Sequence, residues 1–68
     1  SPMKLAIMPD AEIVATVDWL ALIKEDAQAA QAEQVRIRAE FQAAFEQGLV
    51  ARGFRRDEHR PAYLLYAA

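Results

Sequence analysis

A long run without glycine or proline limits what this chain can fold into. The run extends from Ala11 to Gln47 and is rich in Ala, Gln, Glu and Leu, which are strong helix formers. Pro9 blocks extension of a helix towards the N-terminus, and Asp10 stands where an N-cap is needed. The run therefore predicts helix from Ala11 onward.

Two glycines compete to end the predicted helix. In the first alternative, Gly53 is the left-handed residue that follows the C-cap. Leu49 and Phe54 would then be the apolar pair that accompanies a Schellman motif. Gly48 is the alternative, but the apolar pattern continues beyond it. We therefore place the helix at about residues 11–52.

Within the run, apolar or small residues recur at alternating spacings of three and four, the heptad pattern of helices that pair. About 40 helical residues extend roughly 60 Å, twice the width of a domain of this size. Either the helix stays continuous, or it folds back between Glu25 and Gln31 into a helical hairpin whose second helix is capped by Asp26. A helical homodimer is expected in both cases. Its predicted interface consists of Ile13, Leu20, Ile23, Ala27, Ala30, Ile37 and Phe41.

The pattern changes from helix to strand after Gly53. Phe54 to Arg56 is expected to be extended, Asp57 to Arg60 to form a turn, and Ala62 to Ala67, dense in Tyr and Leu, to form a strand. These segments predict a short C-terminal β-hairpin.

The N-terminal segment KLAIM also alternates, with Leu5 and Ile7 on one side, and is a candidate partner strand for the hairpin. The chain is thus expected to be one small, mainly α-helical domain over residues 1–68. Ser1 and Pro2 are set aside as cloning residues.

Composition restricts the chemistry open to this chain. Cysteine is absent, which excludes disulfides and thiolate metal sites. His59 is the only histidine, and no nucleophile with an orienting base lies near it in the sequence. Asp57, Glu58 and His59 are consecutive and cannot converge on one ion from an extended chain. We expect no enzymatic activity, no metal and no cofactor.

The hydrophobic segments are too short for membrane insertion or secretion. No run reaches the roughly 20 apolar residues that cross a bilayer, and the N-terminal segment is too short for a secretory signal. A soluble, cytoplasmic protein is expected.

Charge is distributed unevenly along a chain whose net charge is −2. Acidic side chains prevail from Asp10 to Glu33 and arginines from Val35 onward, which permits an anionic partner or self-association. Trp19 and Leu22 lie at the edge of the heptad pattern or outside it, so the N-terminal half is buried on more than one side or carries a binding patch. The candidate partner-binding residues are Trp19, Leu22, Arg52, Arg55, Arg56, Arg60, Tyr63 and Tyr66.

The segment LVARGFRRDEHRPAYLLY, from Leu49 to Tyr66, resembles the end of the recognition helix and the wing of winged helix-turn-helix regulators. In that family a helix finishes at a glycine, an apolar residue follows, and a basic hairpin leads to a strand with tyrosine or leucine. The resemblance implies DNA binding, with arginines on phosphates. The arginines concerned are Arg52, Arg55, Arg56 and Arg60. Upstream, residues 24–36 lack the glycine that usually marks the turn between the two helices.

Three functions remain open at this point. The leading hypothesis is a homodimeric, non-enzymatic module that binds another protein and modulates it as an inhibitor or adaptor, because arginine with tyrosine and tryptophan is the composition that protein interfaces favour. The second is a DNA-binding regulator that uses the basic segment 52–60, although the net charge of −2 opposes contact with phosphate. The third is a purely structural oligomerisation module.

Overall fold

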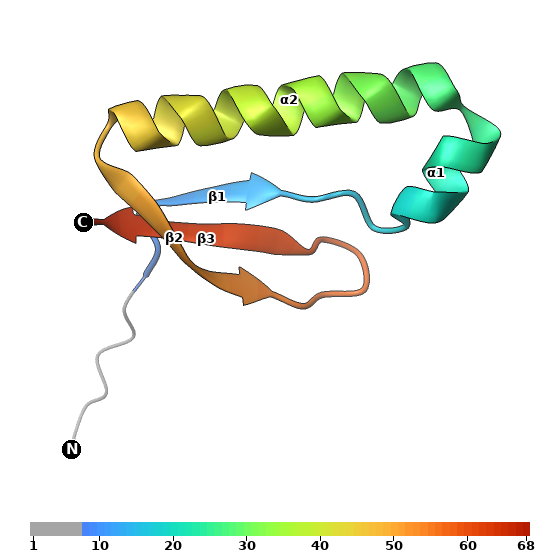
Figure 1. Ribbon diagram of the computed structural model, residues 1–68. Coiled ribbons are helices and arrows are strands. Elements are labelled where there is room, and N and C mark those ends of the chain that lie inside the picture. Colours follow the sequence, from blue (N-terminus) through green and yellow to red (C-terminus); the bar gives the residue numbers. More distant parts are fainter. Residues whose placement is uncertain (1–7) are drawn as a thin grey trace.

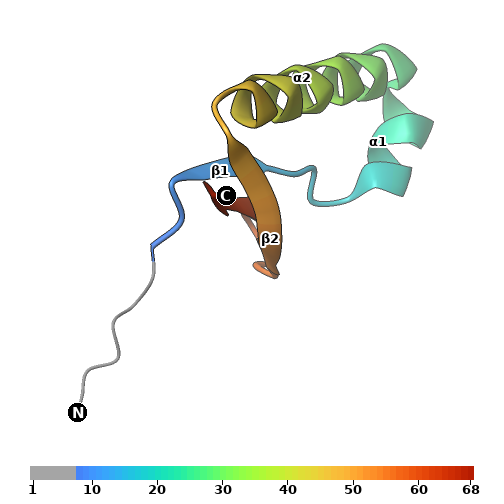
Figure 2. The ribbon, with the colours of Figure 1, turned by 60° about the vertical axis from the view of Figure 1, so that its left-hand side comes forward.

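The computed structural model describes residues 8–68 as a helical layer packed on a small sheet (Figure 1). The elements follow in the order β1 (Ala11–Val14), α1 (Trp19–Glu25), α2 (Ala27–Glu46), β2 (Leu49–Arg55) and β3 (Ala62–Ala67). The strands form one antiparallel sheet in the order β1-β3-β2, so the last strand of the chain lies at the centre. The long helix α2 lies along one face of this sheet, and the short helix α1 lies near its N-terminal end (Figures 1 and 2).

This mixed α/β fold corrects the prediction of a mainly α-helical protein. The segment expected to begin the helix is β1, which contains Ile13 and Val14 and is soon followed by Val17. Branching at Cβ restricts these side chains in a helix and favours extended backbone. Asp10 does not cap a helix, because its carboxylate accepts a hydrogen bond from the backbone N–H of Ala67 at 2.8 Å.

The expected N-terminal strand KLAIM includes Leu5 and Ile7, which lie outside the described residues. Within the described part of the chain, β1 pairs with β3, and Ile13 lies opposite Tyr63. The central strand is therefore paired along both of its edges.

The long helix is interrupted at Asp26, inside the segment where the hairpin alternative placed its turn. The backbone N–H of Asp26 donates to the carbonyl of Leu22 at 2.8 Å, and its side chain accepts from the N–H of Ala29 at 3.0 Å. The predicted capping role of Asp26 is confirmed. Its φ of −155° and ψ of 90° belong to the extended region that any residue can adopt, so the bend requires neither glycine nor proline.

Gly48, and not Gly53, stands at the end of the helix. Its φ is 85°, a left-handed conformation that favours glycine, and its N–H donates to the carbonyl of Phe45 at 3.0 Å. The helix ends earlier than predicted because Leu49 and Val50 pair with β3 instead of continuing the helix.

The C-terminal hairpin follows the prediction closely at its turn and second strand. The Asp57 carboxylate accepts hydrogen bonds from the backbone N–H groups of His59 at 2.8 Å and Arg60 at 3.0 Å, which closes the turn. β3 covers Ala62–Ala67, as expected. The first strand is longer than expected, since β2 begins at Leu49.

The core lies between α2 and the sheet. Leu65 is fully buried and Ile13 and Ala44 nearly so, with Ala11, Ile37, Phe41 and Leu49 packed against them.

The chain's own sheet covers the C-terminal half of the interface predicted for a helical homodimer, so that part of the apolar pattern does not need a second helix. Dimerisation itself stays a prediction. Ile37 and Phe41 pack against the core, while Ala30 is buried nearer the N-terminal end of α2. Ile13 does not belong to a helix at all. The remaining residues of the predicted interface are exposed: Leu20, Ile23 and Ala27.

Candidate protein-binding groove

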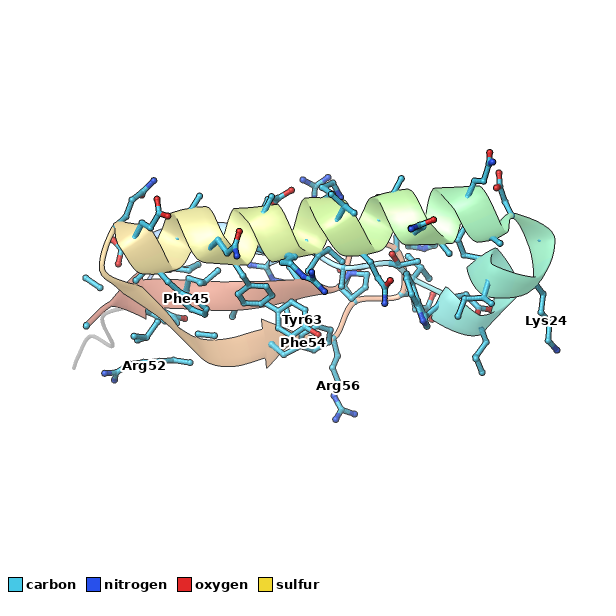
Figure 3. The ribbon with its side chains drawn as sticks, turned by 45° about the horizontal axis from the view of Figure 1, so that its top comes forward. Lys24, Phe45, Arg52, Phe54, Arg56 and Tyr63 are labelled. Atoms are coloured by element: carbon cyan, nitrogen blue, oxygen red, sulfur yellow. The ribbon has the colours of Figure 1, made fainter. Side chains whose placement is uncertain are left out.

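Phenylalanine and tyrosine rings form a continuous row between α2 and the β2 side of the sheet (Figure 3). The ring centroid of Phe41 lies 5.7 Å from that of Phe45 and 5.1 Å from that of Tyr63. The Tyr63 ring lies 5.0 Å from that of Phe54. Tyr63 meets Phe41 and Phe54 edge to face, at 65° and 66°, a favoured arrangement of aromatic pairs.

Secondary structure explains why these rings meet. Phe41 and Phe45 are four residues apart on α2 and share one side of the helix. Phe54 and Tyr63 are opposite each other in the β2–β3 pairing. Tyr63 points to the helix side of the sheet, as Leu65 does, because alternate residues of a strand share a face. The row thus joins α2, β3 and β2.

Much of the row is open to solvent. Phe45 is 54% exposed, Phe54 45% and Tyr63 37%. By contrast, Leu64 and Tyr66 are half-buried on the other face of the sheet, which is turned away from α2. Contiguous exposed apolar surface in a small protein marks a site of interaction more often than isolated exposed residues do.

An open pocket of about 380 Å³ adjoins the row at Tyr63. Trp19 from α1 and Ile37 from α2 are its large apolar lining residues, and Gln34 and Arg38 line it as well. The term "aromatic groove" below denotes the surface formed by the row and the two apolar lining residues: Trp19, Ile37, Phe41, Phe45, Phe54 and Tyr63.

One arginine of the pocket and two arginines of the β2 side lack carboxylate partners among the described residues. Arg38 lines the pocket, and Arg52 and Arg56 project from the β2 side of the molecule (Figure 3). Within residues 8–68, none of the three takes part in an ion pair. Cations beside exposed rings favour a partner with negative charge.

Arg55 differs from its neighbours because it is paired within the chain. Its guanidinium donates to both carboxylate oxygens of Glu12, at 2.8 and 2.7 Å. The hydrogen bond lowers the pKa of Glu12 and raises the pKa of Arg55. This pair connects β1 to β2 across the central strand, so Arg55 contributes to the sheet and is less available to a partner than Arg52 or Arg56.

The predicted partner-binding residues are therefore only partly brought together. Trp19 and Tyr63 line the pocket of the aromatic groove. Leu22 is half-buried on α1, and Arg60 is exposed in the hairpin turn. Tyr66 is half-buried on β3, the strand that also contains Tyr63, but it faces the other side of the sheet.

Sequence reasoning missed Phe45 and Phe54 as binding candidates. The spacing of four between Phe41 and Phe45 was available as a signal. Phe54 gave no comparable signal, because its position opposite Tyr63 depends on the register of the hairpin, including the irregularity between Ala51 and Gly53.

The described residues offer little else for chemistry. Residues 8–68 contain no cluster of His, Asp and Glu side chains able to hold a metal ion. In the same part of the chain, neither helix combines the length and the apolar character needed to cross a membrane.

Comparison of the chain with protein-family profiles, with characterised proteins and with solved structures found no match. The function is therefore argued from the groove itself.

Proposed function

We propose that this protein is a non-enzymatic interaction module that binds another protein through the aromatic groove. The observation that carries the proposal is the row of rings from Phe45 to Phe54, three of them half-exposed, together with arginines that have no ion pair within residues 8–68. Each half-exposed ring has roughly 100 Å² left to bury, which is worth about 2.5 kcal/mol before the costs of association. Aromatic residues and arginine are also the types that dominate binding energy at interfaces.

A pull-down from the source cell tests this proposal. The double variant Phe45→Ser and Phe54→Ser removes two exposed rings that do not belong to the buried core. We expect the double variant to fold, as shown by an unchanged far-ultraviolet circular dichroism spectrum. The amount of partner that it recovers should be at least tenfold lower than the amount recovered by the unaltered chain.

Val35→Ser provides the matched control. Val35 is 63% exposed on α2 but does not line the aromatic groove, so its replacement removes apolar surface elsewhere. Recovery should be unchanged. Equal recovery by the double variant and the unaltered chain would exclude the groove as the binding surface.

A second candidate function is binding of duplex DNA, in line with the resemblance of the C-terminal segment to a winged helix-turn-helix wing. Two observations favour it: the chain has a break between α1 and α2 at Asp26, and arginines without ion pairs lie on the β2–β3 hairpin. Those arginines are Arg52, Arg56 and Arg60. The acidic residues Asp57 and Glu58 in the same turn oppose contact with phosphate.

Retention on random-sequence duplex DNA at low salt tests the second candidate. Under that hypothesis, retention falls steeply as salt rises and is lost in the double variant Arg52→Gln and Arg56→Gln. Lys24→Gln removes one positive charge from α1, whereas the double variant removes two. It should have less than half the effect of the double variant, because Lys24 lies far from the hairpin (Figure 3). No retention at low salt would remove this candidate.

A further inference from the structure

β2 is an edge strand whose outward backbone groups have no partner among the described residues. The carbonyl of Gly48 accepts from the N–H of Ala68 at 3.1 Å, which makes these two a hydrogen-bonded pair. In an antiparallel ladder such pairs alternate with pairs whose backbone groups point away. The register therefore directs the N–H and C=O groups of Leu49 and Ala51 outward, and those of Phe54 likewise beyond the irregularity.

The residues with outward backbone groups also face the helix. Ala51 is opposite the buried Leu65, and Phe54 is opposite Tyr63, so both lie on the α2 side of the sheet. A strand added beside β2 would run about 4.8 Å from it and place alternate side chains next to them. Those side chains would contact the exposed rings of Phe45 and Phe54. Backbone pairing and side-chain burial are thus offered by the same edge.

Charge indicates what kind of strand this edge accepts. Arg52 lies in the middle of β2 and Arg56 directly after its end, and neither is ion-paired within the described residues. Two copies of β2 paired antiparallel about their centres would bring Arg52 against Arg52, an unfavourable juxtaposition of like charges. An acidic segment of a different protein would instead neutralise these cations.

We infer that β2 accepts an extended, acidic segment of a partner protein as a fourth strand of the sheet, with its apolar side chains in the aromatic groove. The inference deepens the proposed protein-binding function and depends on it. Main-chain hydrogen bonds to the strand edge supply affinity, and the rings and arginines select alternating apolar and acidic side chains.

Two synthetic peptides test the inference with the full chain. One alternates glutamate with valine and phenylalanine, and the other has lysine in place of every glutamate. Amide hydrogen exchange, followed by NMR, reports on the backbone directly. The acidic peptide should slow exchange at the amides of Leu49, Ala51 and Phe54 and leave that of Glu12, on the opposite edge strand, unchanged. The basic peptide should bind at least roughly tenfold more weakly.

Variants separate the backbone contribution from the charge contribution. Ala51→Pro removes one outward N–H at an edge position, where proline is tolerated, and should weaken binding of the acidic peptide. The double variant Arg52→Glu and Arg56→Glu should reverse the preference in favour of the lysine peptide. This second variant leaves the strand's hydrogen bonds intact, so it remains informative if the proline variant does not fold.

Several outcomes would overturn the inference. Absence of binding by the acidic peptide at millimolar concentration excludes strand addition, as does binding that leaves the β2 amides unprotected. Equal binding of both peptides excludes the charge preference. Protection of the same amides that rises with protein concentration alone identifies a second copy as the occupant. The proposed protein-binding function is tested separately, by the pull-down with the double variant Phe45→Ser and Phe54→Ser. If that variant recovers less partner while any of the outcomes above occurs, the protein binds its partner through the groove without strand addition.

Discussion

Gly48 is the residue at which helix gives way to strand. Its φ of 85° is the single positive value among the described residues, and a Cβ built there would meet nothing within 4 Å. Glycine is therefore favoured at this position by its positive φ and not by a lack of space for a side chain. Gly53 lies inside β2, has no positive φ, and would place a Cβ in ordinary contact with Leu64 at 3.6 Å.

These two glycines give a matched pair of substitutions. We expect Gly48→Ala to lower the free energy of unfolding by about 1–2 kcal/mol, because a side chain disfavours the left-handed conformation. Gly53→Ala should be neutral or stabilising by up to about 1 kcal/mol, since glycine weakens a strand interior. Urea unfolding of both variants is the measurement. A larger loss at Gly53 than at Gly48 would place the helix stop at Gly53 after all.

Arg36 attaches α2 to β1 through a compact set of hydrogen bonds. Its guanidinium donates to the carbonyl of Val14 at 2.7 Å and pairs with Glu33 at 2.8 Å and Glu40 at 2.7 Å. Thr16 donates to the same Glu33 carboxylate at 3.1 Å. Hydrogen bonds from Arg36 and then from Thr16 lower the pKa of Glu33, and the carboxylates raise that of Arg36.

The lowered pKa of Glu33 predicts a loss of stability in acid. A carboxyl group whose pKa is lower in the folded state stabilises the fold at pH values above its unfolded pKa, about 4.3. This contribution is lost as pH falls through the folded value. The urea concentration at the unfolding midpoint should therefore decrease as the pH is lowered below about 4.3. The decrease should be smaller in Glu33→Gln. Glu12 and Asp57 have lowered pKa values too, so the variant isolates one share of the effect. An identical pH profile in Glu33→Gln would refute the assignment.

At the scale of the elements, the helical region is divided into two helices at a single capping residue. α1 and α2 meet at Asp26, and no glycine or proline interrupts the run. The absence of glycine and proline excludes one cause of a helix break. It does not exclude a second cause, a side chain that accepts hydrogen bonds from the backbone N–H groups. The hairpin alternative located this position correctly, whereas the choice between a continuous and a broken helix depended on what α1 and α2 pack against.

Replacing the cap tests its role. Asp26→Ala should lower the free energy of unfolding by about 1 kcal/mol, because the N–H of Ala29 loses its acceptor. Asp26→Asn keeps a capping oxygen and should stay within a few tenths of a kcal/mol of the unaltered chain. Urea unfolding followed by far-ultraviolet circular dichroism measures both. An alanine variant as stable as the asparagine variant would show that packing alone sets the bend.

At the scale of the whole molecule, the core lies between α2 and the sheet, and α1 contributes no buried residue. Leu65 is fully buried in β3, while Leu20 on α1 is 69% exposed. A chain of 68 residues has a free energy of unfolding of roughly 3–10 kcal/mol, so one core side chain accounts for much of it.

Two substitutions of the same type compare core with surface. Leu65→Ala should cost about 2–5 kcal/mol and leave the chain largely unfolded at physiological temperature. Leu20→Ala should change the free energy of unfolding by less than about 0.5 kcal/mol. Thermal unfolding of both variants is the measurement. A destabilisation by Leu20→Ala that matches Leu65→Ala would show that α1 is covered in solution, contrary to this fold.

The features readable from local sequence are those with a local cause. The helix over much of residues 27–46 follows from helix propensity, the turn after Arg56 from the Asp57 side chain, and β3 from its Tyr and Leu content. Two of the six groove residues, Trp19 and Tyr63, were predicted as partner-binding residues from their type and place in the sequence pattern.

The rest depends on contacts between segments far apart in the chain. The Cβ-branched residues among 11–14 favour extended backbone, but these four residues become a strand only because β3, some fifty positions later, offers hydrogen-bonding groups to pair with. The same pairing builds the sheet that covers Ile37 and Phe41. The apolar stripe of the helix, which looked suited to a second helix, is therefore buried against the chain's own sheet. Burial is a property of what lies opposite a side chain, and periodicity along the chain identifies an apolar face without naming its partner.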